Sequence, residues 1–167
     1  MDIILWRHAQ VNDDAPDQLR CLTELGHQQA QQMASWLDQR LSDDYAVWTS
    51  EAQRTRQTAA YLKHPALAMS GLNATAAYQD VLALIQRQPL NASLVLVGHQ
   101  PWLGHLCHCL LNRTPTSNRL YPVSKGVIWW FGIDATEPLL HSRLKVMLSP
   151  DLVLPTAGSE TNRGKKA

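Results

Sequence analysis

Short apolar runs occur along the chain, and the clearest of them end abruptly in polar residues. Residues 3–6 are apolar and are followed at once by Arg7 and His8, while residues 94–97 are followed by Gly98 and His99. Runs of this length and composition are typical of buried strands. The pattern predicts strands at residues 3–6, 45–49, 66–69 and 94–97.

Between these runs, apolar residues recur at the spacing of amphipathic helices. Thr23 can cap the first of these helices, and Pro101 stands near the first position of the last. Residues 11–22 are rich in Asn, Asp and Pro and are expected to form a loop. The spacing predicts helices over residues 23–40 and 52–63, and further helices that start near residues 78 and 101.

Strands that alternate with helices predict an α/β fold. We expect a three-layer sandwich with a mainly parallel central sheet and helices on both faces. Two strand-like runs at residues 127–133 and 143–148, separated by residues 134–140 without helical spacing, predict a C-terminal antiparallel hairpin. Residues 1–154 are expected to form one domain, and the small, polar and basic residues 155–167 a flexible tail.

Polar residues that are far apart in the sequence are expected to meet at one edge of this sheet. Arg7 and His8 follow the first strand, Ser50 and Arg54 follow the second, and His99 follows the strand at residues 94–97. In open α/β sheets, ligands bind beyond the carboxyl ends of the strands. The sequence therefore predicts one pocket that contains these five side chains.

The residue types in this predicted pocket suit a phosphoryl group better than a metal ion. Guanidinium groups match phosphate oxygens with two parallel hydrogen bonds. The amides at the start of the helix near residue 101 would add positive potential. A histidine can attack phosphorus through one nitrogen if a backbone carbonyl holds the other.

Composition narrows the possible partners. The chain has 167 residues, is 45% hydrophobic and carries a formal net charge of +1, so nothing suggests a nucleic-acid or anionic-membrane partner. Three cysteines, Cys21, Cys107 and Cys109, make neither an even set nor a zinc spacing, which favours a reducing compartment. We expect a cytoplasmic protein, because no apolar run approaches the length of a signal peptide or membrane span.

Four ordered motifs resemble the histidine phosphatase superfamily, and in particular its small SixA-type phosphohistidine phosphatases. They are Arg7-His8-Ala9, Arg20-Cys21-Leu22-Thr23 with Gly26, Ser50-x-x-x-Arg54-x-x-Gln57-Thr58, and Gly98-His99-Gln100-Pro101. A single Arg-His pair is a weak signal. Four motifs in the expected order and on the expected elements are a strong one.

The resemblance implies roles for five residues. His8 would be the nucleophile that becomes a phosphohistidine, and Arg7, Arg54 and His99 would bind and stabilise the phosphoryl oxygens. Arg20 matches an arginine that joins this pocket in SixA-type proteins. The resemblance further implies a metal-independent enzyme without a cofactor, and a phosphohistidine-carrying protein as the substrate. The sequence leaves the oligomeric state open, with a monomer favoured.

Two departures from the superfamily pattern bear on activity. Ala9 stands where glycine is usual, which is tolerated unless that residue needs a positive φ. Larger members place a carboxylic acid before the fourth strand, whereas residues 71–79 contain no acidic residue and Asp80 falls inside a predicted helix. An alkoxide needs a proton from such an acid, but a phosphoramidate nitrogen can leave already protonated. The missing acid therefore favours phosphohistidine as the substrate over a phosphate ester.

Other interpretations remain open at this point. The protein could be a phosphomonoesterase for small sugar or nucleotide phosphates, with Asp80, Asp13 or Asp14 as the acid, or a phosphoprotein-binding module that does not turn over. Arg54 could pair with Glu51 on the surface, and Trp102 could line the mouth of the site. The cluster His105, Cys107, His108 and Cys109 could bind a metal, although Cys107 falls in an apolar stripe.

Overall fold

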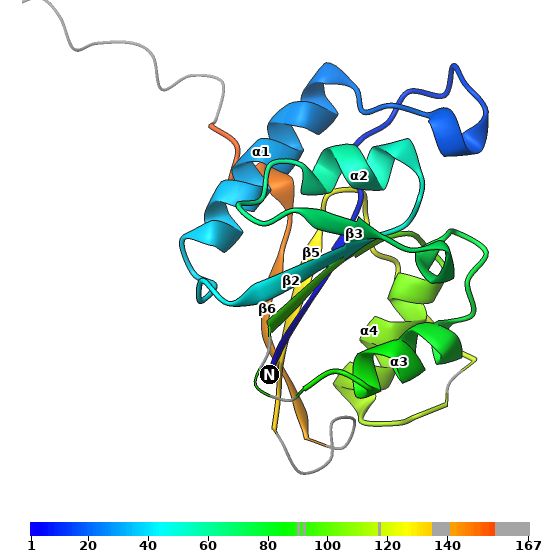
Figure 1. Ribbon diagram of the computed structural model, residues 1–167, viewed down its shortest axis with the longest axis vertical. Coiled ribbons are helices and arrows are strands. Elements are labelled where there is room, and N and C mark those ends of the chain that lie inside the picture. Colours follow the sequence, from blue (N-terminus) through cyan, green and yellow to red (C-terminus); the bar gives the residue numbers. More distant parts are fainter. Residues whose placement is uncertain (90, 92, 117, 135–140, 156–167) are drawn as a thin grey trace, which may run out of the picture.

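A six-stranded mixed sheet forms the centre of the computed structural model, which describes residues 1–89, 91, 93–116, 118–134 and 141–155. The sheet order is β3-β2-β4-β1-β5-β6 (Figure 1). The first four of these run parallel, and β5 and β6 are antiparallel to their neighbours. The strands are β1 Asp2–Arg7, β2 Tyr45–Thr49, β3 Ala66–Ala68, β4 Ser93–Gly98, β5 Ile128–Ile133 and β6 Ser142–Leu148.

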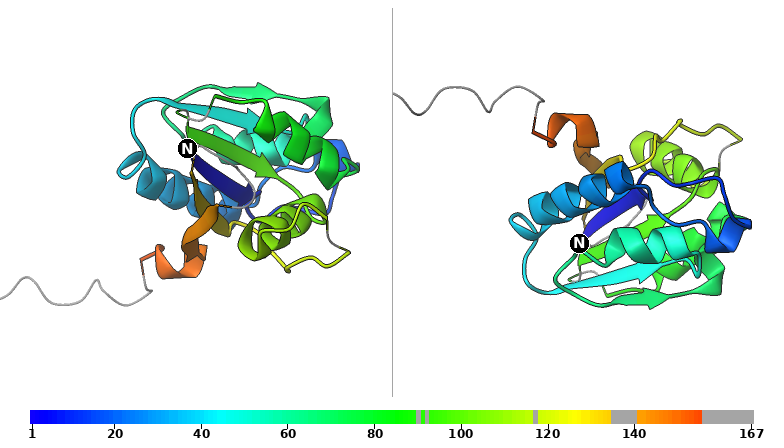
Figure 2. Two further views of the ribbon diagram at one scale, coloured as in Figure 1. Left: turned by 90° about the horizontal axis from the view of Figure 1, so that it is seen from below. Right: turned by 90° about the horizontal axis from the view of Figure 1, so that it is seen from above.

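Helices cover both faces of the sheet. α1 and α2 lie on one face, and α3 and α4 lie on the other (Figure 2). The helices are α1 Glu24–Asp38, α2 Gln53–Ala59, α3 Tyr78–Gln86 and α4 Trp102–Asn112, with short 3₁₀ turns η1 Asp17–Leu19, η2 Ser70–Leu72 and η3 Pro150–Leu152. The predicted three-layer α/β sandwich and the C-terminal hairpin are confirmed.

The pattern of burial explains why the central strands are continuously apolar. Ile3 and Leu5 of β1 pack in the core under α3 and α4, whereas Ile4 and Trp6 pack in the core under α1 and α2. Strands covered on both faces need apolar residues at every position. In β5, Trp130 likewise packs on the α1 side and its neighbours Trp129 and Phe131 on the other.

Two predictions need adjustment, and a third falls outside the described residues. The helix predicted over residues 52–63 ends at Ala59, because the chain must turn before Pro65 and return to β3. Trp102 does not line the site: it is 1% exposed in the core under α4, and a Cβ on Gly98 would clash with its ring. The predicted tail, residues 155–167, lies outside the described residues apart from Pro155. Within the described chain, no helix has the length and apolar character needed to cross a membrane.

Candidate active site

The carboxyl ends of β1, β2 and β4 meet at one edge of the sheet and form a pocket of about 300 Å³. The loop that carries η1 and the start of α2 contribute to its lining, so residues from the first and last thirds of the chain meet there. The pocket is lined by Arg7, His8, Val11, Asp13, Asp17, Arg20, Arg54, Ala74, His99, Gln100 and Lys125. The five residues to which the resemblance gives roles are among them, whereas Ser50, which was also predicted to lie in the pocket, does not line it.

His8 has one ring nitrogen held by the backbone and the other free. Its Nδ1 lies 2.8 Å from the carbonyl oxygen of Ala9. A carbonyl can only accept, so Nδ1 carries the proton and Nε2 has a lone pair. Burial is the largest cause that lowers the pKa of His8 to about 3, and the charges of His99, Arg54 and Arg7 add to it. The ring is therefore neutral at pH 7.

The backbone around His8 is fixed from two directions. The His8 amide donates to Gly98 of the neighbouring strand end, and the Ala9 amide donates to Thr58 Oγ1 at 3.1 Å. Among the described residues, only Arg113 and Gly126 have a positive φ. Ala9 therefore adopts a conformation open to any L-residue, which explains why alanine can stand there.

Arg54 projects from α2 into the pocket and is only 5% exposed. Its Nη2 lies 3.1 Å from Asp17 Oδ2 and 3.2 Å from His99 Nδ1, and its Nη1 donates to the Asp17 carbonyl. Glu51 instead bonds to Asn73. The interpretation of Arg54 as a surface partner of Glu51 is therefore wrong.

His99 is held by Arg54 on one side and by Ser50 on the other. Its Nε2 lies 2.7 Å from Ser50 Oγ, the hydroxyl at the end of β2. Burial is the main cause that lowers the pKa of His99 to about 4, and the charge of Arg54 lowers it further, against the opposing effect of Asp17. His99 is also neutral at pH 7. Its ring centroid lies 5.4 Å from that of His8.

Arg7 at the end of β1 and Arg20 after η1 both line the pocket. Arg7 Nη1 donates to the Val123 carbonyl at 2.6 Å, and burial, followed by the charge of Arg54, lowers its pKa. Arg20 Nη1 lies 3.4 Å from Asp13 and 3.9 Å from Asp17. Arg20, which the resemblance matches to an arginine of this pocket, thus lies in the pocket wall.

Three further motif residues, Thr23, Gly26 and Gln57, hold the loop and do not line the pocket. Thr23 caps α1 by accepting from the Gly26 amide, and Gln57 Oε1 accepts from the Leu22 amide at 2.8 Å. A Cβ at Gly26 would come within 2.0 Å of the Gln10 carbonyl oxygen. Only glycine fits where α1 passes so close to the chain that follows His8.

Sequence reasoning missed several pocket residues. The sequence pattern marks Asp17 only as a loop residue and gives no signal for Lys125 or Ala74, although all three line the pocket. Of the carboxylates considered as acids, Asp13 lines the pocket, whereas Asp14 and Asp80 do not. The segment before α3 contributes Ala74 where larger superfamily members would carry an acid. Lys125 precedes Gly126, whose amide donates to the carbonyls of Arg7 and His8.

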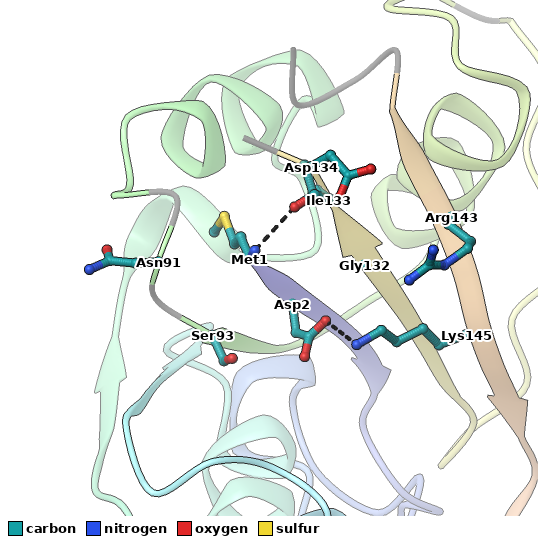
Figure 3. A pocket seen from close by; sticks show the side chains of 9 residues that line it. All are labelled: Met1, Asp2, Asn91, Ser93, Gly132, Ile133, Asp134, Arg143 and Lys145. Carbon is teal, nitrogen blue, oxygen red and sulfur yellow. Dashed lines mark hydrogen bonds and ion pairs between the residues drawn. The ribbon is translucent and has the colours of Figure 1, made fainter. Parts of the chain in front are cut away.

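Polar side chains and cysteines also gather outside this pocket. A hollow of about 340 Å³ lies at the opposite end of β1, and there Asp2 and Lys145 point toward one another and pair at 2.6 Å (Figure 3). Within the described residues, no group of three or more His, Cys, Asp or Glu is arranged to hold a metal ion. Cys107 and Cys109 are both buried, and burial raises the pKa of both thiols.

Comparisons with known proteins agree with this geometry. Residues 3–77 match the family model of the histidine phosphatase superfamily (branch 1). The chain is 25% identical to a protein assigned as the phosphohistidine phosphatase SixA of Nakamurella multipartitia, over 89% of this chain and 95% of that one, with a TM-score of 0.72. A search of curated proteins gives no significant match.

Two other solved structures share the fold at lower identity. One is the protein histidine phosphatase SixA complexed with tungstate, which is 22% identical over 92% of this chain and all of that one, with a TM-score of 0.76. The other is phosphoserine phosphatase from Entamoeba histolytica in complex with phosphoserine, at 16% identity, 92% and 99% coverage, and a TM-score of 0.68. The resemblance to the histidine phosphatase superfamily is thereby confirmed, in sequence over residues 3–77 and in fold over most of the chain.

Proposed function

We propose that this protein is a phosphatase that removes the phosphoryl group from phosphohistidine on a protein, through a phosphohistidine intermediate on His8. One observation carries the proposal. The Ala9 carbonyl accepts the Nδ1 proton of a buried, neutral His8 and leaves a lone pair on Nε2, in a pocket that contains four cationic side chains. A neutral imidazole nitrogen held in this way is a competent nucleophile toward phosphorus.

The first step forms one bond and breaks another. His8 Nε2 forms the new N–P bond, and the bond from phosphorus to the substrate imidazole breaks. A substrate ring that enters protonated on its second nitrogen leaves as neutral imidazole, so no further proton is needed. His8 keeps its proton on Nδ1, and the Ala9 carbonyl stabilises the positive ring. Water then attacks phosphorus and returns the lone pair to Nε2.

Phosphoryl transfer depends mainly on position and on charge spread over the equatorial oxygens. Arg7, Arg20, Arg54 and Lys125 supply four cations to the pocket, and Asp13 and Asp17 supply two carboxylates. With both histidines neutral, two positive charges remain. This balance matches a phosphoryl group that carries two negative charges.

Among the described residues of the pocket, no carboxylic acid is well suited to protonate a leaving group, which supports a substrate with a nitrogen leaving group. Asp17 is a poor proton donor, because its hydrogen bond and ion pair with Arg54 outweigh partial burial and lower its pKa. Asp13 has a side chain that is 80% exposed and bonds to Arg20. Ala74 occupies the wall where a donor would be expected. Phosphoserine phosphatase has the same fold, so a phosphomonoesterase that uses Asp13 is the second candidate.

Purified protein in EDTA should be offered a histidine-phosphorylated carrier protein and, separately, a panel of phosphomonoesters. We expect phosphate release from the carrier and an acid-labile phosphate on the enzyme during turnover. Ala74→Glu is the matched variant, since it restores a carboxylic acid to the wall, and it should gain activity toward esters. Release from esters alone by the unaltered protein would overturn the phosphohistidine proposal in favour of the second candidate.

A further inference from the structure

The hydrogen bonds around His99 specify which of its nitrogens carries the proton. Arg54 can only donate, so the Nδ1 that lies 3.2 Å from Arg54 Nη2 must accept. The ring is neutral, so the proton is on Nε2 and is donated to Ser50 Oγ at 2.7 Å. In the free protein, His99 thus presents a lone pair to the side of the pocket occupied by Arg54.

The groups beyond Ser50 are consistent with this assignment. Ser50 Oγ accepts from His99 and from the Ala52 amide, and it donates to Thr55 Oγ1 at 2.7 Å. Thr55 Oγ1 in turn donates to the Ala52 carbonyl at 2.9 Å. Every donor in this buried chain therefore has a compatible acceptor. If His99 carried its proton on Nδ1 instead, two donors would face one another at Arg54.

This arrangement cannot persist when a phosphoryl group binds against His99. Phosphoryl oxygens are acceptors, and an acceptor cannot contact the bare lone pair of Nδ1 favourably. Arg54 Nη2 has two hydrogens, which it gives to Asp17 and to His99 in the free protein. When Arg54 turns a hydrogen toward the phosphoryl group, Nδ1 loses its donor. A proton on Nδ1 would remove both conflicts.

We propose that His99 takes up one proton on Nδ1 when a doubly charged phosphoryl group binds, and that it holds this group as an imidazolium donor. The inference rests on the proposed function of the pocket. The proton comes from solvent and forms an N–H bond at Nδ1, no other covalent bond changes, and the proton returns to solvent when phosphate leaves. His99 therefore changes its charge within each catalytic cycle, whereas Arg7 and Arg54 do not.

The charged groups that face His99 explain why the proton arrives only with the ligand. Arg54 of α2 and Arg7 of β1 oppose a charge on the ring, and among the described residues Asp17 of η1 favours it. His8 of β1 faces it as a neutral ring. Two negative charges placed in the pocket reverse this balance and raise the pKa of His99. The Ser50 hydroxyl can keep its hydrogen bond to Nε2 throughout.

Proton-linked binding can be measured with sulfate, which carries two charges and no proton near neutral pH. Titration calorimetry in two buffers of different ionisation enthalpy should show uptake of close to one proton per sulfate. The affinity should rise by about tenfold for each unit that pH falls between the free and bound pKa of His99. His99→Gln, whose amide can donate without a proton from solvent, should bind sulfate without uptake. His27→Asn, outside the pocket, should behave like the unaltered protein.

A spectroscopic measurement on the unaltered protein tests the same inference without depending on whether His99→Gln folds. Nitrogen NMR of the ring should show a proton on Nε2 alone in the free state and on both nitrogens with sulfate bound. Sulfate binding without proton uptake, or a free-state proton on Nδ1, would overturn this inference and leave the proposed function standing. Failure of sulfate, phosphate and tungstate to bind at all would overturn both.

Discussion

The ends of β1 and β4 each carry a buried histidine, and the two rings hold their protons on opposite nitrogens. At β1, a backbone carbonyl takes the Nδ1 proton of His8 and leaves Nε2 open to the pocket. At β4, a hydroxyl takes the Nε2 proton of His99, and a guanidinium covers Nδ1. The same residue type in neighbouring positions can thus act as a nucleophile or as a ligand for phosphoryl oxygens, depending on what its second nitrogen touches.

The two rings also differ in how far away in the sequence their hydrogen-bond partners lie. The partner of His8 is the next residue in the chain, so the orientation of its ring depends on one peptide group. The partners of His99 come from β2 and α2, and they depend on the packing of three elements. Changes elsewhere in the molecule should therefore disturb His99 more readily than His8.

Replacing His8 should have the largest effect on activity. We expect His8→Ala to reduce kcat by at least about 10⁴-fold, or about 5 kcal/mol, because Arg54 covers the lone pair of His99, the other histidine of the described pocket. Phosphate binding should be partly retained, since the arginines remain. Rapid-quench measurement of phosphate release and of labelled protein tests both statements. Normal turnover by this variant would mean that the two histidines have been assigned the wrong roles.

Replacing His99 should cost less and should act differently. We expect His99→Ala to lower kcat by about 10²- to 10³-fold, the usual effect of removing one donor to a developing oxyanion. Labelled phosphate should still appear on His8, because the nucleophile is intact. His99→Gln should recover part of the rate. If His99→Ala abolished labelling as completely as His8→Ala, the distinction between the rings would fail.

The buried neutral state of both rings predicts an acid-side loss of stability. The folded-state pKa of His8 is about 3, below its unfolded value of about 6.5, so only the unfolded chain gains this proton as pH falls. The contribution of the neutral His8 ring to the free energy of unfolding is fully present above about pH 6.5 and is lost progressively as the pH falls toward 3. At pH 5 the loss is about 2 kcal/mol for such a residue. Urea unfolding at pH 7 and pH 5 should show a smaller decrease for His8→Ala than for the unaltered protein.

Asp17 should have the smallest effect, because its side chain is largely exposed. Its carboxylate accepts a hydrogen bond from Arg54 Nη2 in the free protein, so this donor is not available to an anion. We expect Asp17→Asn to bind inorganic phosphate a few-fold more tightly, which is within the range of about 0.2–1 kcal/mol for exposed pairs. Calorimetry of phosphate binding measures the change, and Asp14→Asn, outside the pocket, is the matched control. Weaker binding by Asp17→Asn would show that Asp17 helps to organise the anion site.

The fold and most of the pocket were predictable from sequence, because both depend on regular spacing. Continuous apolar runs located β1 and β4, and parallel strand order placed Arg7, His8 and His99 at one edge. The ring protons were not predictable, since they depend on a carbonyl and a hydroxyl whose positions require coordinates. Asp17 and Lys125 were missed because no spacing links a loop or a turn before β5 to the parallel strands.

The two surplus positive charges of the pocket have a consequence after the reaction is over. Inorganic phosphate released inside the pocket carries nearly the same charge and the same oxygens as the group that was transferred. A site that recognises the phosphoryl group mainly by charge also retains the product. The protein should therefore be subject to product inhibition, and its turnover in the cell would fall as the local concentration of free phosphate rises.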